Sequence, residues 1–328
     1  MPSLPVPTRL AGTRSRRPAP PSGPRVVVLG DLLVDVVIAS DRALERGTDV
    51  TGHVSFRQGG SAASTARWLG RLGARSSLIC AIGYDPAGRA LIGTLVSDGV
   101  TPRAVRVAGS RTGRIGVMVD ADGERSFVTD RAAALKLRPE DLRPEWFTGA
   151  EAVHLPAYSL LDQPLGVAGM IATHMAREAG ALVTVDLSSA APLLASGRRA
   201  AMALIREASP DLLFATRDES KALMGPKNEE RLLELAPIAI VKRGRKGVTV
   251  LARTDGAEPM RFEVATSPIK AEDTTGAGDA FDAGFLAGWL EARRKGLAPA
   301  AALQRGAVLG NRTALRHLTS RPVELVFG

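Results

Sequence analysis

The sequence predicts an α/β fold with a mostly parallel central sheet, helices on both of its faces and a small β-sheet lid. Short apolar runs alternate with helical stretches of about 10–18 residues, which is typical of βαβ units. Two extended segments, at residues 35–58 and 112–128, lack helical periodicity and interrupt this alternation. The chain has 328 residues and is 45% hydrophobic, so it can build one large domain of this kind.

The predicted strands of the central sheet are short, largely apolar runs. The first, RVVVLGD at residues 25–31, is rich in β-branched residues and ends in glycine, as buried parallel strands do. Five later runs share this character: SSLICAIG (76–83), AVHLPAY (152–158), ALVTVDL (181–187), DLLFAT (211–216) and PIAIVKRG (237–244). Right-handed crossovers between such strands place ligand sites at their carboxyl ends.

The helices predicted between these strands lie at residues 61–72, 164–179, 192–208 and 298–316. The two segments without helical periodicity are predicted to form the lid. The second of them, TGRIGVMVDADGERSFV, predicts a hairpin that turns at DADG. Its stretch RIGVMV (114–119) alternates in a way that supplies an apolar outer face, so we expect a homodimer formed through the lid.

The charge distribution does not favour nucleic acid as a partner. The formal net charge is +9, but residues 1–25 contain five arginines and no acid, so the excess is concentrated there. Aromatic residues make up only 4% of the chain, and no RNA- or DNA-binding signature occurs. A basic surface that attracts anionic small molecules accounts for the rest of the charge.

The first 24 residues are predicted to be a disordered tail, and residues 25–328 to be the folded domain. Residues 1–25 hold seven prolines, which forbid a regular helix and hence an amphipathic transit peptide. Arg16 and Arg17 invite comparison with an export signal, but PAPPSGP follows where an apolar segment is required. No apolar run reaches 18 residues, so no membrane association is expected.

The only cysteine, Cys80, lies in the apolar run SLICAIG. An intramolecular disulfide is therefore impossible, which fits a reducing, cytoplasmic location. We expect Cys80 to be buried and structural, because a catalytic thiol needs a polar neighbourhood. The four histidines (His53, His154, His174 and His317) show no metal-ligand spacing and are expected to be structural or exposed.

The most informative stretch is DTTGAGDAFDAGF, at residues 273–285. A dinucleotide fingerprint would need Gly or Ala where Phe281 stands, and no Walker Gly-Lys-Ser/Thr sequence occurs. One remaining possibility is a tight turn with Asp279 as a helix cap. The other is that the N–H groups of residues 276–279 hold a phosphoryl group while Asp279 accepts a proton from a substrate hydroxyl. The helix start favours ionised Asp279, which predicts a low pKa.

This stretch, extended to DTTGAGDAFDAGFL, closely resembles the C-terminal signature of the PfkB, or ribokinase-like, sugar kinase family. GGSAASTARWLGRLGA (59–74) is similar to a second family signature, in which a Gly-Gly pair leads into a helix. GDLLVDVV (30–37) is similar to a third. The three occur in the family's order from about residue 25 onward. The resemblance implies a three-layer α/β/α fold with a β lid, ATP as donor, Mg²⁺ on its phosphates and a hydroxymethyl acceptor.

The resemblance also implies roles for individual residues. Asp279 falls on the catalytic base and Gly276, Ala277 and Gly278 on the anion hole. On the acceptor side it implies Asp35 and Ser64 as sugar contacts and Gly59 and Gly60 as the hinge of the lid. On the nucleotide side it implies Thr216, Glu219, Lys242, Gly244 and Gly247, with Glu219 organising the water ligands of Mg²⁺. In some members the positions of Asp273 and Thr275 lie beside a monovalent cation such as K⁺.

Two of these positions have ordinary alternatives, and two others depart from the family. Lys242 is alternatively a solvated charge at a strand end, and Glu219 an exposed helix acid. Ser64 and Thr216 stand where the family has asparagine, and each offers one hydroxyl in place of an amide. Three functions stay open: a kinase of a ribose-like or fructose-like sugar, a nucleoside kinase, and a sugar-sensing protein that has lost turnover.

Overall fold

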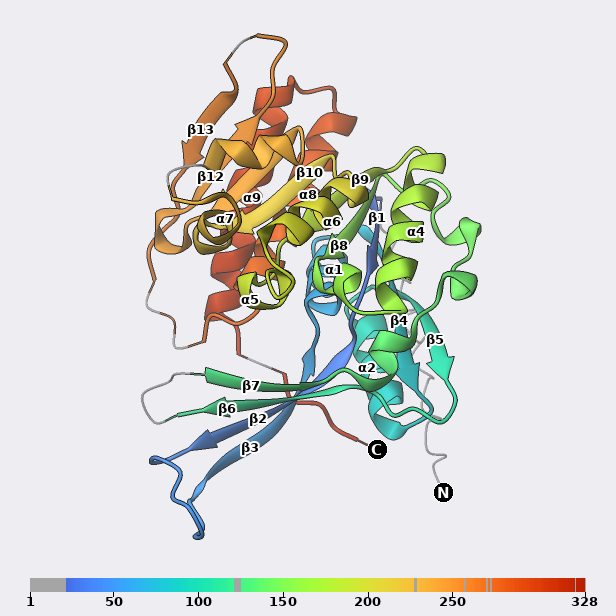
Figure 1. Cartoon of the computed structure of the whole chain (residues 1–328), viewed down its shortest axis with the longest axis vertical. Coiled ribbons are helices and arrows are strands. Elements are labelled where there is room, and N and C mark those ends of the chain that lie inside the picture. Colours follow the sequence, from blue (N-terminus) through green and yellow to red (C-terminus); the bar gives the residue numbers. More distant parts are fainter. Residues whose placement is uncertain are drawn as a thin grey trace, which may run out of the picture.

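The structure, a computed structural model, describes residues 22–120, 125–226, 229–256, 258–269, 271, 273–321 and 323–327. These residues form a large helix-covered sheet, from which a smaller sheet projects at one edge (Figure 1). The chain leaves the large sheet after its first strand, builds half of the small sheet, and returns through Gly59 and Gly60.

The central sheet has nine strands in the order β13-β12-β11-β10-β9-β8-β1-β4-β5. All neighbours from β11 to β5 are parallel, whereas β12 pairs antiparallel with both β11 and β13. The strand bounds are β1 Arg25–Leu29, β4 Arg75–Gly83, β5 Thr101–Val107, β8 Ala152–Pro156, β9 Leu182–Asp186, β10 Leu212–Thr216, β11 Ile238–Lys242, β12 Val248–Ala252 and β13 Met260–Val264.

Helices cover this sheet on both faces, and each face has its own buried apolar cluster. On one face lie α1 Ser61–Arg71, α2 Pro86–Ser97, α8 Ala277–Arg294 and α9 Pro299–Thr319. On the other lie α3 Tyr158–Leu161, α4 Leu165–Glu178, α5 Ala190–Leu193, α6 Arg198–Ala208 and α7 Arg217–Met224. Short 3₁₀ turns lie at Ala132–Lys136, Pro139–Asp141, Pro144–Trp146, Glu229–Glu234 and Gly244–Lys246. The predicted three-layer α/β/α fold is confirmed.

Several strands and helices differ from the sequence prediction, among them α2, which was not predicted. The single helix expected at 192–208 is wrong, because the chain breaks between α5 and α6, with Gly197 at φ 88° immediately before α6. β5, β12 and β13 were not predicted. β5 and β13 carry charged residues among their apolar ones and lie toward the two edges of the sheet, so they do not form the apolar runs that mark central strands.

The small sheet has four strands in the order β3-β2-β6-β7, and we call it the lid. Its bounds are β2 Leu33–Ser40, β3 Gly52–Gly59, β6 Arg114–Val119 and β7 Arg125–Asp130. β2 pairs antiparallel with β3 and parallel with β6, and β6 and β7 form an antiparallel pair. The turn predicted at DADG falls largely on residues 121–124, which lie outside the described residues.

The chain is already attached to the core at residues 22–24. The Gly23 N–H donates to the Gly73 carbonyl at 3.3 Å, and Arg75 N–H donates to Pro24 at 2.9 Å. Arg294 donates to the Ser22 carbonyl at 3.0 Å. The boundary of the tail at residue 24 stays a prediction; residues 22–24 contact the folded domain, while residues 1–21 lie outside the described part. No helix within that part is long and apolar enough to cross a membrane.

Candidate active site

Asp279 lies in the first turn of α8, directly after the glycine turn. Gly276 adopts φ 80° and precedes the helix. The Ala277 N–H donates to Thr274 at 3.2 Å, so it is not free for a ligand. Among the described residues, the N–H groups of Gly278 and Asp279 have no partner within the chain. Of the four N–H groups predicted to form the anion hole, at 276–279, that of Ala277 is thus already used, while those of Gly278 and Asp279 are open.

The carboxylate of Asp279 has a pKa opposite to the sequence expectation. The pKa of Asp279 is raised to about 7. Burial is the largest cause of the rise and the carboxylates of Asp186 and Asp35 add to it, while a hydrogen bond from Ser61 and the charge of Lys242 act against it. The low pKa that we expected from the helix start is therefore wrong, because desolvation outweighs the favourable dipole. A carboxylate that titrates near neutral pH is well matched to general-base catalysis.

A buried ion network lies beneath this helix start. The Lys242 ammonium contacts Asp186 Oδ1 at 3.0 Å and Asp282 Oδ1 at 3.1 Å, and the three side chains are 10%, 5% and 0% exposed. Burial lowers the pKa of Lys242, but the carboxylates of Asp186, Asp282 and Glu219 raise it more, so the ammonium stays charged. A Cβ added to Gly278 would lie 3.3 Å from Nζ. Lys242 is thus not a solvated charge at the strand end, and its ammonium lies next to the backbone of Gly278.

Thr216 and Glu219 cap the start of α7 together. The Thr216 N–H donates to Glu219 Oε2 at 2.7 Å, and the Glu219 N–H donates to Thr216 Oγ1 at 3.2 Å. Glu219 is buried, so the alternative of an exposed helix acid is wrong. Burial raises its pKa, and Asp186 adds to the rise. Threonine, like the family's asparagine, is among the residues preferred at a helix N-cap, and Thr216 makes the capping bond, so the local structure survives this replacement.

Gly244 and Gly247 shape the turn between β11 and β12. They have φ values of 56° and 84°, and the Arg243 N–H closes the turn by donating to Gly247 at 2.8 Å. A Cβ on Gly247 would come within 2.1 Å of the Val264 carbonyl oxygen. The turn therefore needs Gly247 for its own geometry.

On the lid, Asp35 extends from β2 opposite Arg57 of β3. Its Oδ1 is buried and has no hydrogen-bond partner among the described residues. The pKa of Asp35 is raised to about 7: burial is the largest cause and Asp273 adds to it, while the charge of Arg57 acts against the rise. A buried acceptor atom without a partner costs free energy unless a ligand satisfies it. Asp35 is therefore built to receive a hydrogen-bond donor.

The Gly59–Gly60 pair permits this arrangement at the root of the lid. A Cβ on Gly59 would lie 1.9 Å from Asp35 Oδ1, and one on Gly60, at φ 97°, would lie 2.3 Å from the Asp31 carbonyl oxygen. The positive φ and the backbone contact require glycine at position 60, whereas a side chain at position 59 would displace the Asp35 carboxylate. Ser64, in the first turn of α1, is half-buried and donates its N–H to Gly60 at 2.9 Å.

Asp273 and Thr275 connect the loop before α8 to the lid. The carboxylate of Asp273 pairs with Arg125 of β7 and with Arg57, the second at 3.5 Å. Arg125 also donates to the Thr275 hydroxyl. The described residues contain no group of three or more His, Cys, Asp or Glu that could hold a metal ion.

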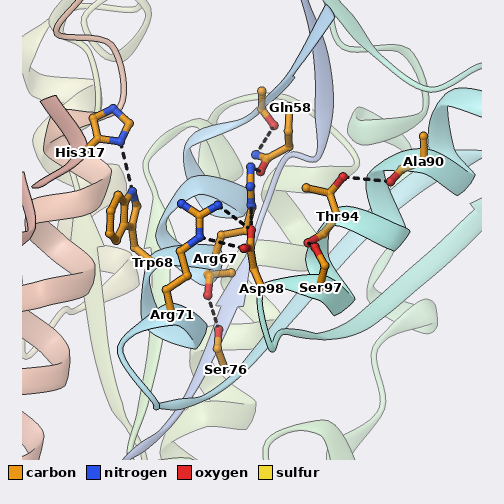
Figure 2. Close-up of polar contacts among 12 residues, drawn as sticks. Gln58, Arg67, Trp68, Arg71, Ser76, Ala90, Thr94, Ser97, Asp98 and His317 are labelled. Atoms are coloured by element: carbon orange, nitrogen blue, oxygen red, sulfur yellow. Dashed lines mark hydrogen bonds and ion pairs between the residues drawn. The ribbon is translucent and has the colours of Figure 1, made fainter. Parts of the chain in front are cut away.

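His317 of α9 supports the same loop from behind. The Trp68 indole N–H, which can only donate, reaches His317 Nδ1 at 3.2 Å (Figure 2). His317 Nε2 therefore carries the proton and donates to the Thr275 carbonyl at 2.7 Å. The Thr275 carbonyl oxygen, near which a monovalent cation was predicted, therefore already accepts one hydrogen bond.

Several residues of the site were missed by the sequence analysis: Ser61, Arg125, Asp186, Asp282 and His317. Asp186 had a usable signal, since an acid at the carboxyl end of a buried parallel strand lies where α/β folds bind ligands. Asp282 also had a usable signal, because it lies three residues after Asp279 on α8 and therefore on the same side of that helix. Ser61, Arg125 and His317 come from other helices or from the lid and meet the site only through tertiary packing.

The fold and this geometry define a class: an α/β protein with a lid, a helix start that has open N–H groups and a carboxylate beside them. The model of the pfkB family carbohydrate kinases matches residues 24–325. The chain belongs to this family and is an ATP-dependent carbohydrate kinase.

Its relatives in sequence are sugar kinases. It is 30% identical over 276 residues to probable fructokinase-3 of Arabidopsis thaliana, covering 80% of this chain and 76% of that one. To the fructokinase of Solanum tuberosum it is 31% identical over 271 residues, covering 80% and 79%. Among solved structures, the adenosine kinase from Sinorhizobium meliloti is similar with a TM-score of 0.78 and 25% identity, covering 93% and 97%. The fructokinase from Vibrio cholerae O395, at 23% identity and a TM-score of 0.74, covers 92% and 94% and shares the fold.

Proposed function

We propose that the protein transfers the γ-phosphoryl group of ATP to a hydroxymethyl group of a small ribose-like or fructose-like sugar, with Asp279 as the base. One observation carries the proposal: a carboxylate of near-neutral pKa stands beside the open N–H groups of Gly278 and Asp279. The fructokinase relatives support a sugar as the acceptor.

In this reaction the acceptor hydroxyl gives its proton to Asp279 as its oxygen bonds to the γ-phosphorus. The bond from that phosphorus to the bridging oxygen breaks, and ADP leaves. The N–H groups of Gly278 and Asp279 hold the negative charge that spreads over the transferred oxygens. Asp35, whose Oδ1 has no partner within the described chain, accepts hydrogen bonds from other hydroxyls of the sugar.

The acidic groups of the nucleotide side fit Mg²⁺, which prefers oxygen ligands and keeps several of its waters. Glu219 uses Oε2 to cap α7, which leaves Oε1 to hold such a water. The pKa of Glu219 is raised by burial and by Asp186, and a nearby divalent cation would stabilise the charged form. When bound, Mg²⁺ supplies charge neutralisation on the ATP phosphates.

The contacts of Lys242, Gly244 and Gly247 within the chain indicate how each would act on the nucleotide. The charge of Lys242, next to Gly278, attracts the phosphates of ATP. Gly244 and Gly247 form the turn after β11, which lies on the nucleotide side of the site in this scheme. K⁺ beside Asp273 and Thr275 stays a prediction. Its test is turnover in potassium chloride compared with tetramethylammonium chloride at equal ionic strength, and equal rates would remove it.

A nucleoside kinase is the second candidate, favoured by the similarity to the adenosine kinase structure. A thermal-shift screen of fructose, ribose and adenosine separates the two, because a ligand at 100 times its Kd stabilises the fold by about 2.7 kcal/mol. Stabilisation by adenosine alone would favour the second candidate. Binding of a sugar without turnover would favour the third possibility, a sensing protein.

The test of the proposed chemistry is Asp279→Asn, which keeps the shape of the side chain and cannot accept the proton. Removal of a general base lowers kcat by about 10²–10⁴-fold. ATP binding should survive, since one negative charge beside the γ-phosphate is lost. Glu291→Gln, an exposed acid of the same helix, is the control and should leave kcat unchanged. If Asp279 were only a cap, asparagine would serve equally well, and kcat would stay within about tenfold of wild type.

We also propose that two copies of the protein form a homodimer through the lid. Ile38, Val54, Phe56 and Val128 lie on one face of it by strand register, and they are 39%, 55%, 37% and 63% exposed. An apolar face of this kind marks a protein–protein contact. Light scattering at micromolar concentration should show a dimer that Val128→Asp converts to monomer. Monomeric wild-type protein would remove the proposal.

A further inference from the structure

Ser61, the first residue of α1, lies against the proposed base. Its hydroxyl donates to Asp279 Oδ1 at 2.6 Å, and Thr65, one turn further on, donates to the Asp279 carbonyl at 3.5 Å. These hydrogen bonds join the start of α1 to the start of α8, although Ser61 and Asp279 are 218 residues apart in the sequence. The bond is short because one partner is ionisable.

Several hydrogen bonds and ion pairs attach α1, the helix that begins with Ser61, to its surroundings (Figure 2). Arg67 bonds to Gln58 of β3 and to Asp98, and Arg71 Nε reaches Asp98 at 2.8 Å. Ser76 of β4 donates to the Ala66 carbonyl at 2.8 Å. With Trp68 bonded to His317, the helix is fixed to the lid strand β3, the end of α2, the central sheet and α9. Ser61 is therefore a fixed donor.

The two carboxylate oxygens of Asp279 are consequently unequal. Oδ1 accepts from Ser61, whereas Oδ2 has no hydrogen-bond partner among the described residues and lies 3.9 Å from the position of a Cβ on Gly276. Oδ2 is the oxygen on the side of the glycine turn, where the phosphoryl group would be held. It is the one free to take a proton.

We infer that Ser61 is a positioning residue for the phosphoryl-transfer reaction: its hydroxyl holds Oδ1 of Asp279, so that Oδ2 faces the acceptor and the carboxylate stays ionised. The inference rests on the proposed function of Asp279. Ser61 touches neither substrate in this scheme, and it acts only through the base.

The pH dependence of turnover is the property that Ser61 should control. Asp279 is faced by Asp186 of β9 and Asp35 of β2, whose charges raise its pKa, and by Lys242 of β11, whose charge lowers it. Asp282 on the same helix, Tyr158 of α3 and His317 of α9 complete the surroundings. Burial is the main cause of the raised pKa, and the bond from Ser61 is the largest influence against it. Without that bond the carboxylate is protonated up to a higher pH.

The experiment compares Ser61→Val with Ser61→Thr, two side chains of the same shape that differ in the hydroxyl. At saturating substrates, kcat should rise with pH because the base must be ionised. In Ser61→Val the midpoint of this rise should move up by about one pH unit, with kcat about tenfold lower below it and recovered at high pH. Ser61→Thr should restore the wild-type profile. Ser61→Ala provides a smaller side chain for the same comparison.

Thr173→Val is the matched control, because it also removes one buried hydroxyl hydrogen bond, to the Met170 carbonyl at 2.8 Å in α4, on the face of the sheet away from α1. It should lower the melting temperature and leave the pH profile of kcat unchanged. An unshifted profile in both Ser61→Val and Ser61→Ala, with Asp279→Asn inactive, would overturn the role of Ser61 alone. Asp279→Asn with nearly normal kcat would overturn the proposed function and this inference together.

Discussion

Two groups of ion pairs flank the glycine turn, and they differ in burial. Beneath it, Lys242, Asp186 and Asp282 have side chains at most 10% exposed. Above it, Arg57 and Arg125 of the lid meet Asp273, with side chains 29%, 19% and 34% exposed. Charges buried together depend strongly on each other, whereas half-exposed pairs contribute little to stability. The buried group of Lys242, Asp186 and Asp282, which we call the floor of the site, is therefore rigid. The lid can separate from it at a small cost in free energy.

Removal of Lys242 should give the largest effect. Lys242→Met leaves two buried carboxylates without their cation, so the free energy of unfolding should fall by about 3–5 kcal/mol. Denaturant titration measures this, and the double variant Lys242→Met, Asp282→Leu should recover part of the loss. The control Lys246→Met, at an exposed lysine in the next turn, should change stability by less than about 0.5 kcal/mol. Equal midpoints for Lys242→Met and wild type would mean that the floor is no stronger than the lid contacts.

Asp35→Ala should give the next largest effect, on binding. Loss of a charged hydrogen-bond partner costs about 1.5–3 kcal/mol, which corresponds to a KM for the acceptor raised about 10- to 150-fold. The KM for ATP should not change. Asp41→Ala, an exposed acid of the same lid, should leave both constants unchanged. A rise confined to the KM for ATP would reverse our placement of the two substrates.

Asp273→Asn should have a small effect, because it weakens only the half-exposed pairs between lid and core. The free energy of unfolding should fall by less than about 1 kcal/mol, and the KM for the acceptor should rise by less than about fivefold. Thermal unfolding and steady-state kinetics provide the two measurements. A loss comparable to that of Lys242→Met would show that the lid is held as firmly as the floor.

Deletion of residues 1–22 should change least. The tail is rich in proline and arginine, and the attachment of the chain at Gly23 and Pro24 is retained. Turnover and melting temperature should stay nearly constant in differential scanning fluorimetry. A loss of several degrees would show that the tail packs on the domain.

The sequence predicted the parts of this structure that depend on local pattern. Central parallel strands such as β1 and β10 are apolar because both of their faces are buried, and the glycine turn before Asp279 is contiguous in the chain. The edge strand β13 alternates exposed and half-buried residues and was overlooked.

The electrostatics of the site could not be predicted in the same way. Lys242 looks like any lysine at a strand end until Asp282 of α8 is folded over it. The pKa of Asp279, on α8, depends on burial and on the charges of Asp186, Asp35 and Lys242, which lie on three different strands. The local sequence shows that a helix begins near Asp279, and the helix dipole lowers the pKa of that carboxyl. It does not show the burial, whose opposite effect on the pKa is larger.

The bond from Trp68 to His317 has an optical consequence. The chain has three tryptophans, and Trp68 is the one whose indole N–H reaches, through His317, the loop that carries the glycine turn. Indole fluorescence responds to the hydrogen bond and charge at its nitrogen. With Trp146 and Trp289 replaced by phenylalanine, the emission of Trp68 becomes an intrinsic reporter of that loop, and binding of each substrate can be followed separately without a label.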